Sequence, residues 1–220
     1  MARKAPLRML ALILAFFGVL VIILSVYPII QYEYVSRKRF PRLVSPITEQ
    51  EHKSILMQSL KDYKELGNWS SEYDLGQGDS DSNEYRLSIP RLKITNAQVY
   101  VGGEDLSKSL IQYPGTARPG QIGNTVIFGH SVLPIFFNPK DYLTIFSTIP
   151  KLKTGDEIVV NSGSVMYKYL VSEMFEVNPD NLNILDQRYD DSFLSLVTCV
   201  PPGHPLNPRR LVVRAKIVKI

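Results

Sequence analysis

The clearest pattern in the chain lies in residues 194–215, which read LSLVTCVPPGHPLNPRRLVVRA. Two runs rich in leucine and valine, 194–198 and 211–215, stand on either side of a loop that contains four prolines. Short apolar runs that are rich in β-branched residues and bounded by proline or glycine are typical of β-strands. The stretch therefore predicts two strands, with Cys199 at the end of the first and Arg210 at the start of the second.

Five further runs of the same kind precede this stretch, and turns with glycine or proline separate them. They are residues 85–89, 98–101, 124–128, 157–160 and 166–171. Residues 104–111 are the one segment of this part that we predict as a short helix. Seven or eight short strands with few helices predict an all-β fold, a barrel or a sandwich, over residues 84–220.

The N-terminal segment of residues 7–30 is almost wholly apolar and carries no charge after Arg8. About 20 apolar residues in a helix suffice to cross a bilayer core of ~30 Å. Basic residues flank the segment on both sides, so the charge count alone does not orient it, but the short leader favours a cytoplasmic N-terminus. Residues 25–28 offer no small-x-small cleavage site. We therefore predict an uncleaved, single-pass anchor in the cell membrane over residues 1–30, with the remaining domain outside the cell.

A spacer is predicted to join the anchor to the β domain. Residues 48–66 begin with the capping-box spacing of Thr48 and Glu51, which predicts a helix. Residues 68–83 are rich in serine, glycine and aspartate, which is typical of a flexible linker. The expected domains are the anchor (1–30), the spacer (31–83) and the β domain (84–220).

Composition excludes several classes of function. The formal net charge of +4 is small, and no stripe of lysine and arginine with interleaved aromatic residues stands out, so we expect no nucleic-acid partner. One cysteine and three scattered histidines give no zinc spacing, and we expect neither a metal nor another cofactor. A single cysteine forms no internal disulfide. Cys199 is therefore a buried apolar side chain, an unpaired intermolecular thiol or a nucleophile.

Three residues that can carry chemistry stand at the ends of predicted strands: His130, Cys199 and Arg210. Taken singly, His130 suits an ordinary loop, Cys199 suits the core, and Arg210 suits a solvated surface. Together they suit covalent catalysis, because an imidazole can take the proton of a thiol and leave the reactive thiolate. A guanidinium is permanently charged, and it can stabilise the oxyanion that forms when a carbonyl is attacked.

Four motifs of the chain resemble signatures of the sortase family: YPGTARPG (113–120), GNTVIFGHS (123–131), LVTC (196–199) and RLVVRA (210–215). The resemblance covers about residues 85–218, and an N-terminal anchor also suits the family. It implies a closed eight-stranded β-barrel with a Cys-His-Arg site on its surface. It also implies an enzyme that cleaves a C-terminal motif of the Leu-Pro-x-Thr-Gly kind between Thr and Gly. The cleaved protein then passes to an amine on a cell-wall precursor or a pilin lysine.

The resemblance also assigns roles within the site. Cys199 attacks the carbonyl as a thiolate, and His130 protonates the leaving amine and later deprotonates the incoming one. Arg210 stabilises the oxyanion, and it is preferred to Arg209 because the arginine of the family stands directly before the apolar strand. Adjacent residues of a strand point to opposite faces, so Arg209 is expected to be a solvated neighbour.

Two further residues are predicted to contact the substrate. Thr198, next to the nucleophile, is expected to line the site, although its position in a predicted strand also suits an ordinary strand residue. His204, in a proline-bound flexible loop, is expected to touch substrate or solvent. Some members of the family bind calcium through acidic side chains near the barrel. Residues 113–130 contain no aspartate or glutamate, so we do not expect calcium dependence.

Two other functions stay open from the sequence. A hydrolytic cysteine peptidase uses the same three residues with water as the acceptor, and a non-catalytic, membrane-tethered β-barrel adaptor does not need Cys199. No acidic-Pro-aromatic lid motif precedes the barrel, which weighs against pilus assembly. The expected partners are proteins with a C-terminal sorting signal, an amine acceptor and the lipid bilayer.

Overall fold

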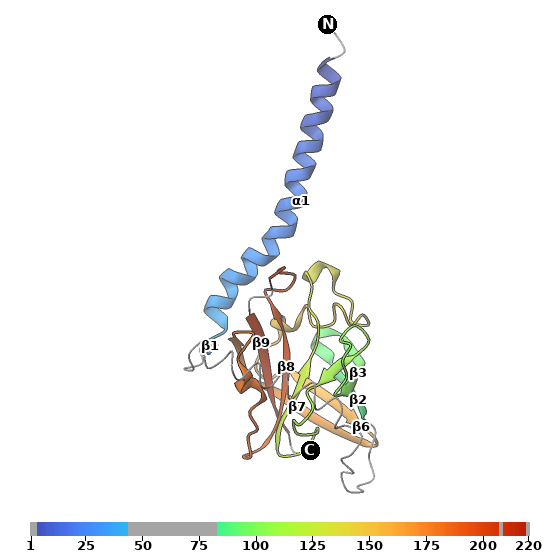
Figure 1. The fold of residues 1–220 in the computed structure, drawn as a ribbon, viewed down its shortest axis with the longest axis vertical. Coiled ribbons are helices and arrows are strands. Elements are labelled where there is room, and N and C mark those ends of the chain that lie inside the picture. The colour runs from blue at the N-terminus through green and yellow to red at the C-terminus, as the bar shows by residue number, and fades with distance from the viewer. Residues whose placement is uncertain (1–3, 44–82, 207–208, 219–220) are drawn as a thin grey trace.

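The computed structural model describes residues 4–43, 83–206 and 209–218, in which a long helix stands beside a β-barrel (Figure 1). The predicted spacer helix (48–66) and all but the last residue of the predicted linker (68–83) lie outside these residues. Four short 3-10 helices lie in the connections between strands of the described part. They are η1 (Pro90–Leu92), η2 (Pro134–Phe136), η3 (Ile149–Lys151) and η4 (Leu182–Leu185).

Eight strands close the barrel. They are β2 (Glu84–Ile89), β3 (Ile94–Val101), β4 (Leu110–Gln112), β5 (Gly123–Phe128), β6 (Glu157–Ser162), β7 (Val165–Val177), β8 (Ser192–Val200) and β9 (Arg209–Ile217). Neighbours pair in the order β7-β6-β2-β3-β4-β5-β8-β9, and pairing of β9 with β7 closes the ring. The β3–β4 and β5–β8 pairs are parallel, and the other pairs of the ring are antiparallel. The predicted closed eight-stranded barrel is confirmed, and every predicted strand lies in one of these eight.

The prediction of a helix over residues 104–111 is wrong. Residues 104–109 form turns and bends, in which both the amide and the hydroxyl of Ser107 donate to the carboxylate of Asp105. β4 follows at Leu110–Gln112, pairs with β3, and is buried along its whole length. An aspartate that accepts from the residue two positions later favours a turn over a helix. Burial between β3 and β5 then makes the apolar residues that follow part of the sheet.

The strands carry two apolar clusters, one on each face. Leu194, Leu196 and Val200 of β8 belong to the large cluster that fills the barrel, whereas Val197 belongs to a second cluster. Side chains alternate between the two faces of a strand, so Val197 points outward. The outer cluster consists of Val126, Phe175, Val177, Ile184, Val197 and Val212. These residues come from β5, β7, β8, β9 and η4, and they form a packed outer face on this part of the barrel.

Helix α1 (Lys4–Arg39) contains the predicted membrane segment and continues beyond it. By length and composition Met9–Arg39 can cross a membrane, and its most apolar part is not buried against the protein. Residues 31–39, which we expected in the spacer, continue the same helix. Phe40 then inserts into the apolar cluster of the barrel, and β1 (Arg42–Leu43) pairs in parallel with β7. The residues that directly follow the helix thus pack into the barrel and pair with its strand β7.

Hydrogen bonds from the backbone and from the side chain of Arg39 fix the end of α1 on the barrel. The amide of Glu176 in β7 donates to the carbonyl of Pro41 over 3.0 Å. The guanidinium of Arg39 donates to the carbonyl of Pro150, over 2.9 Å, and to that of Leu152. One part of the barrel therefore holds the last residue of the helix, and another holds the chain directly after it.

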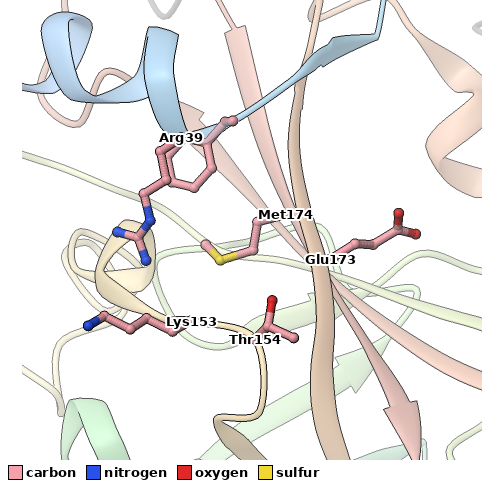
Figure 2. Close-up of a pocket in the computed structure, with 6 residues that line it drawn as sticks. Arg39, Lys153, Thr154, Glu173 and Met174 are labelled. Carbon is pink, nitrogen blue, oxygen red and sulfur yellow. The ribbon is translucent and has the colours of Figure 1, made fainter.

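A pocket of about 490 Å³ opens beside this joint (Figure 2). It is lined by Arg39, Phe40, Lys153, Thr154, Glu173 and Met174. Figure 2 shows Arg39 extending from the end of α1 toward the turn that carries Lys153 and Thr154. None of these six lining residues is a predicted site residue. The pocket is a feature of the joint between helix and barrel, and the candidate active site lies elsewhere.

Candidate active site

Cys199 and Arg210 face each other across the antiparallel β8–β9 pair. Their Cα atoms are register partners, and the flanking pairs of the ladder are Thr198 with Leu211 and Val200 with Arg209. Cys199 lies two residues after the outward-pointing Val197, and directly opposed residues of an antiparallel pair project to the same face. The thiol and the guanidinium therefore both start from the outer face of the barrel, and both residues are half-buried.

His130 is held beside the same position of β8 from the other side. β5 and β8 pair in parallel up to Phe128 and Val197, and the amide of Gly129 continues the pairing by donating to the carbonyl of Val197 over 3.1 Å. The hydroxyl of Ser131 donates to the carbonyl of Cys199 over 2.6 Å. His130 thus lies between two residues that are bonded to the segment around the cysteine. Continuing the register by two residues places it opposite Cys199.

Gly129 is needed for the approach of core side chains. A Cβ atom at this position would lie 2.5 Å from the ring of Phe146 and 2.7 Å from the side chain of Leu110. The neighbours that leave no room for a side chain at Gly129 are therefore side chains of the core. The amide of Phe146 also donates to the carbonyl of His130 over 3.0 Å. Core packing thereby fixes the backbone that carries the histidine.

β8 and β9 pair the residue that carries the thiol with the residue that carries the guanidinium, and the segment after β5 holds His130 beside Cys199. A thiol beside an imidazole can act as an activated nucleophile, and a guanidinium beside the thiol can stabilise an oxyanion. The geometry therefore suits attack on a carbonyl. This arrangement of the three residues follows from the register of the β5–β8 and β8–β9 pairs and from the hydrogen bonds that Gly129 and Ser131 donate to β8.

Residues 87–218 match the family model described as Sortase domain, which covers more than half of the 220 residues. The chain belongs to the sortase family. Sortase A of Bacillus anthracis is 29% identical over 136 residues, which are 60% of this chain and 59% of that protein. Sortase A of Streptococcus agalactiae serotype III (strain NEM316) is 27% identical over 138 residues, 60% of this chain and 52% of that protein. The chain thus aligns with less than two thirds of either relative.

A solved structure shares the architecture. The sortase D5 transpeptidase of Clostridium perfringens superimposes with a TM-score of 0.53 at 20% sequence identity. The superposition covers 89% of this chain and 98% of that chain. At this identity the likeness concerns the fold, which is the closed barrel described above.

Thr198 of this sortase lies inside and not along the outer face. Its side chain is 2% exposed, and its hydroxyl donates to the carbonyl of Gly129 over 2.8 Å. The structure thus places Thr198 away from the substrate-lining position that we expected. Together with the hydroxyl of Ser131 it ties the histidine segment to β8 from both sides of His130. Ser131 stood in a quoted motif, but only the fold reveals its partner.

His204 lies in the loop between β8 and β9, of which residues 201–206 are described. Its amide donates to the carbonyl of Pro201 over 3.0 Å, and its Nδ1 atom accepts from the amide of Leu206 over 3.2 Å. Gly203 of this loop packs against Leu133, which follows the predicted catalytic histidine. The described part of the loop is internally bonded and packed, and it places His204, half-buried, at the end of the barrel that carries the site.

The expectation that Arg209 is solvated is wrong. Its side chain is 13% exposed, its Nε lies 2.8 Å from Oε2 of Glu176, and its terminal nitrogens donate to the carboxylate of Glu33 in α1. Burial lowers the pKa of Arg209, but the hydrogen bond to Glu33 and the charges of both carboxylates outweigh this and raise it. Tyr32 of α1 donates to the other oxygen of Glu176 over 2.8 Å. Arg209 therefore joins the helix to the barrel.

A polar cluster that the motifs did not reveal positions the loop before β8. The hydroxyl of Ser195 donates to the side-chain oxygen of Asn124 over 2.8 Å, and the amide group of that asparagine donates to the carbonyl of Ile184 over 3.1 Å. Gln187 accepts from the backbone amides of Asn124 and Ala117. These bonds hold η4 against the outer face of β5 and β8. Asn124 and Ser195 stand in predicted strands, but their partners are too distant in sequence to be inferred.

Metal-ligating side chains do not gather at this site. Within residues 4–43, 83–206 and 209–218, no group of three histidine, cysteine, aspartate or glutamate side chains could hold a metal ion.

Proposed function

We propose that this sortase is a membrane-anchored cysteine transpeptidase. In this proposal it cleaves a C-terminal sorting motif of the Leu-Pro-x-Thr-Gly kind and transfers the protein to an amine. The observation that carries the proposal is the pairing of Cys199 with Arg210, with His130 held at the same level by the bonds of Gly129 and Ser131. Membership of the sortase family supports the substrate class.

The proposed reaction has two steps. The thiolate of Cys199 attacks the threonine carbonyl, the C–N bond to glycine breaks, and His130 donates the proton that the leaving amine requires. An amine then attacks the thioester, His130 accepts its proton, and the cysteine leaves as the thiolate. The carbonyl oxygen carries negative charge in both tetrahedral intermediates, and Arg210 stabilises it each time. No oxidant, reductant or metal enters this balance.

The setting of the reaction is part of the proposal. The apolar part of α1 suits a single-pass anchor, and we place the barrel outside the cell with the N-terminus in the cytoplasm. The partners are then a protein with a sorting signal, an amine acceptor on a cell-wall precursor or a pilin lysine, and the bilayer.

Trapping the acyl-enzyme tests the proposal. Full-length protein in detergent is incubated with a peptide that carries the motif, and its intact mass is measured. We expect an adduct of the N-terminal peptide fragment on the wild type and none on Cys199→Ala, since this is the single cysteine of the chain. An adduct on the alanine variant, or none on either protein, would refute the proposal.

Adding a free amine separates transfer from hydrolysis. A transpeptidase releases the trapped fragment faster with the amine and yields the amide, whereas a hydrolytic peptidase yields the free acid at an unchanged rate. A non-catalytic adaptor predicts instead that Cys199→Ala keeps full function in cells.

A further inference from the structure

Three exposed apolar side chains lie at the end of the barrel that carries the site. They are Ile135 and Phe136 of η2, which are 68% and 61% exposed, and Leu206 of the β8–β9 loop, which is 81% exposed. The loop with η2 begins directly after His130, and the loop with Leu206 begins directly after the strand of Cys199. We call these three side chains the apolar tips.

The two loops that carry the apolar tips pack on each other. Gly203 has a φ of +78°, and a Cβ atom there would lie 2.7 Å from the backbone nitrogen of Leu133. The contact between the loops therefore requires glycine, both for its backbone conformation and for its lack of a side chain. The apolar tips belong to one surface because this contact holds their loops together.

Helix α1 is fixed to the barrel at the same end. Arg209, which binds Glu33 of the helix, directly precedes Arg210, the register partner of Cys199. In Figure 1 the loop after β5 and the loop between β8 and β9 project from the barrel beside α1, toward the N-terminal part of the helix. With the helix held in this way, a bilayer around its apolar part faces these two loops.

We propose that the apolar tips dock on the lipid surface of the membrane that holds α1, and so keep Cys199 close to that surface. The inference rests on the membrane placement given under the proposed function. Moving exposed apolar side chains from water into the boundary between head groups and acyl chains is favourable. Residues 131–140 and 200–206 contain no aspartate or glutamate, so no carboxylate has to be desolvated or meet anionic head groups there.

Lipid docking gives the site a function in substrate choice. A substrate or acceptor that is anchored in the same bilayer meets the thiol at a raised effective concentration, provided that the geometry allows both to be engaged at once. A soluble peptide gains nothing from the apolar tips. The surface therefore favours membrane-held over soluble substrates without contacting the motif itself.

Fluorescence quenching in lipid nanodiscs tests the docking. The full-length chain carries Trp69→Phe, which removes its single native tryptophan, and one reporter at a time is introduced as Phe136→Trp, Leu206→Trp or Tyr189→Trp. Tyr189 is the matched control, because it is 82% exposed but precedes β8, at the end of the barrel remote from Cys199. The quencher is a phospholipid that is brominated on the first part of its acyl chains.

We expect emission from positions 136 and 206 to fall by about half in brominated relative to plain nanodiscs, because docked side chains lie ~5–10 Å into the lipid boundary. Emission from position 189 should not change. Equal, negligible quenching at all three positions overturns the proposal. Emission at positions 136 and 206 that is insensitive to bromination of the lipid but changes when a soluble sorting peptide or an amine acceptor is added also overturns it, because the apolar tips then bind that partner instead of lipid.

The readout is independent of catalysis. Repeating the measurement with Cys199→Ala should give the same quenching, so failure of the proposed chemistry and failure of lipid docking are separate results. Cleavage of a soluble motif peptide by each reporter variant checks its fold, and no change from the parent rate is expected. Two independent reporter positions keep the test decisive if one substitution disturbs its loop.

Discussion

Arg209 and Arg210 are neighbours in β9, yet they lie in two different regions of the molecule. Arg210 is the partner of Cys199 on the outer face of the β8–β9 pair. Arg209 is the partner of Val200, and its guanidinium lies between carboxylates of α1 and β7. One residue of register thus separates a group that we propose acts on the substrate from a group that holds the helix to the barrel.

Removing a side chain has different consequences around Arg209 and on the outer face around Cys199 and Arg210. Glu176, the partner of Arg209, is 1% exposed, so loss of the arginine leaves a buried carboxylate with less compensation. Breaking a buried ion pair by removing one partner is strongly destabilising. The half-buried outer-face residues instead border solvent, and loss of one mainly affects the reaction. Substitutions on the outer face should therefore lower the rate, and substitutions at Arg209 should lower stability.

The largest effect among the partners of Cys199 is expected for His130→Ala. General acid–base help is worth ~10²–10⁴-fold in rate, and the loss is greater if the thiolate also depends on the imidazolium. We expect kcat/KM for a soluble motif peptide to fall on this scale while the thermal unfolding midpoint stays that of the wild type. His204→Ala is the comparison, with a smaller expected loss. Equal losses in the two variants would mean that the assignment of the histidines needs to be revised.

Arg210→Lys tests whether the outer face needs a guanidinium and not only a positive charge. An ammonium is a point charge on a flexible stem and does not present the planar pair of donors. Loss of one oxyanion donor costs ~10²–10³ in turnover, and we expect a fall of that size in kcat with little change in stability. A lysine variant with wild-type turnover would show that Arg210 acts only through its charge.

The fold could be predicted because its signals are local. Seven strands have alternating or β-branched runs of four residues or more, and each was found. β4 was missed because it has only three residues and follows a segment with helix-like composition, whereas its burial depends on β3 and β5. The continuation of α1 beyond residue 30 was missed for a similar reason, since that part packs on a barrel far along the chain.

The predicted site residues lie at strand ends, where a motif can be read directly. His130, Cys199 and Arg210 were named from their motifs. The β8–β9 ladder pairs Cys199 with Arg210, and the hydrogen bonds of Gly129 and Ser131 hold the segment of His130 beside Cys199. The environment of Arg209 could not be predicted, because its partners lie 176 and 33 residues away in the sequence. Alternation along the strand correctly placed Arg209 on the face opposite to that of Arg210. It did not reveal that the carboxylates of Glu33 and Glu176 lie on that face.

Arg209→Ala is expected to lower the stability of the protein and to leave the rate of the reaction unchanged. Removing one partner of a buried ion pair costs ~3–5 kcal/mol in the free energy of unfolding. We expect a loss close to this range, because the carboxylate of Glu176 is buried. The measurement is the free energy of unfolding of the full-length chain in detergent, with kcat of the surviving folded protein as the second readout. Arg37→Ala is the matched control, since Arg37 pairs with the same Glu33 but its side chain is 71% exposed. A strongly reduced kcat with an unchanged free energy of unfolding would mean that Arg209 acts in the reaction and Arg210 does not.

The smallest effect is expected for Glu33→Gln, which separates the two carboxylates around Arg209. Glutamine keeps the size of the side chain and an oxygen that can accept from the guanidinium, so the variant removes charge with little change in packing. The side chain of Glu33 is 31% exposed, against 1% for Glu176, and water screens an ion pair at such a position. We therefore expect a loss of ~0.5–1 kcal/mol in the free energy of unfolding, which shrinks as salt is added. Because Arg209 keeps Glu176, the helix should stay on the barrel, and kcat for a soluble peptide should not change. A loss as large as that of Arg209→Ala would instead identify the contact with α1 as the dominant partner of the arginine, and would make the packing of the helix a main source of barrel stability.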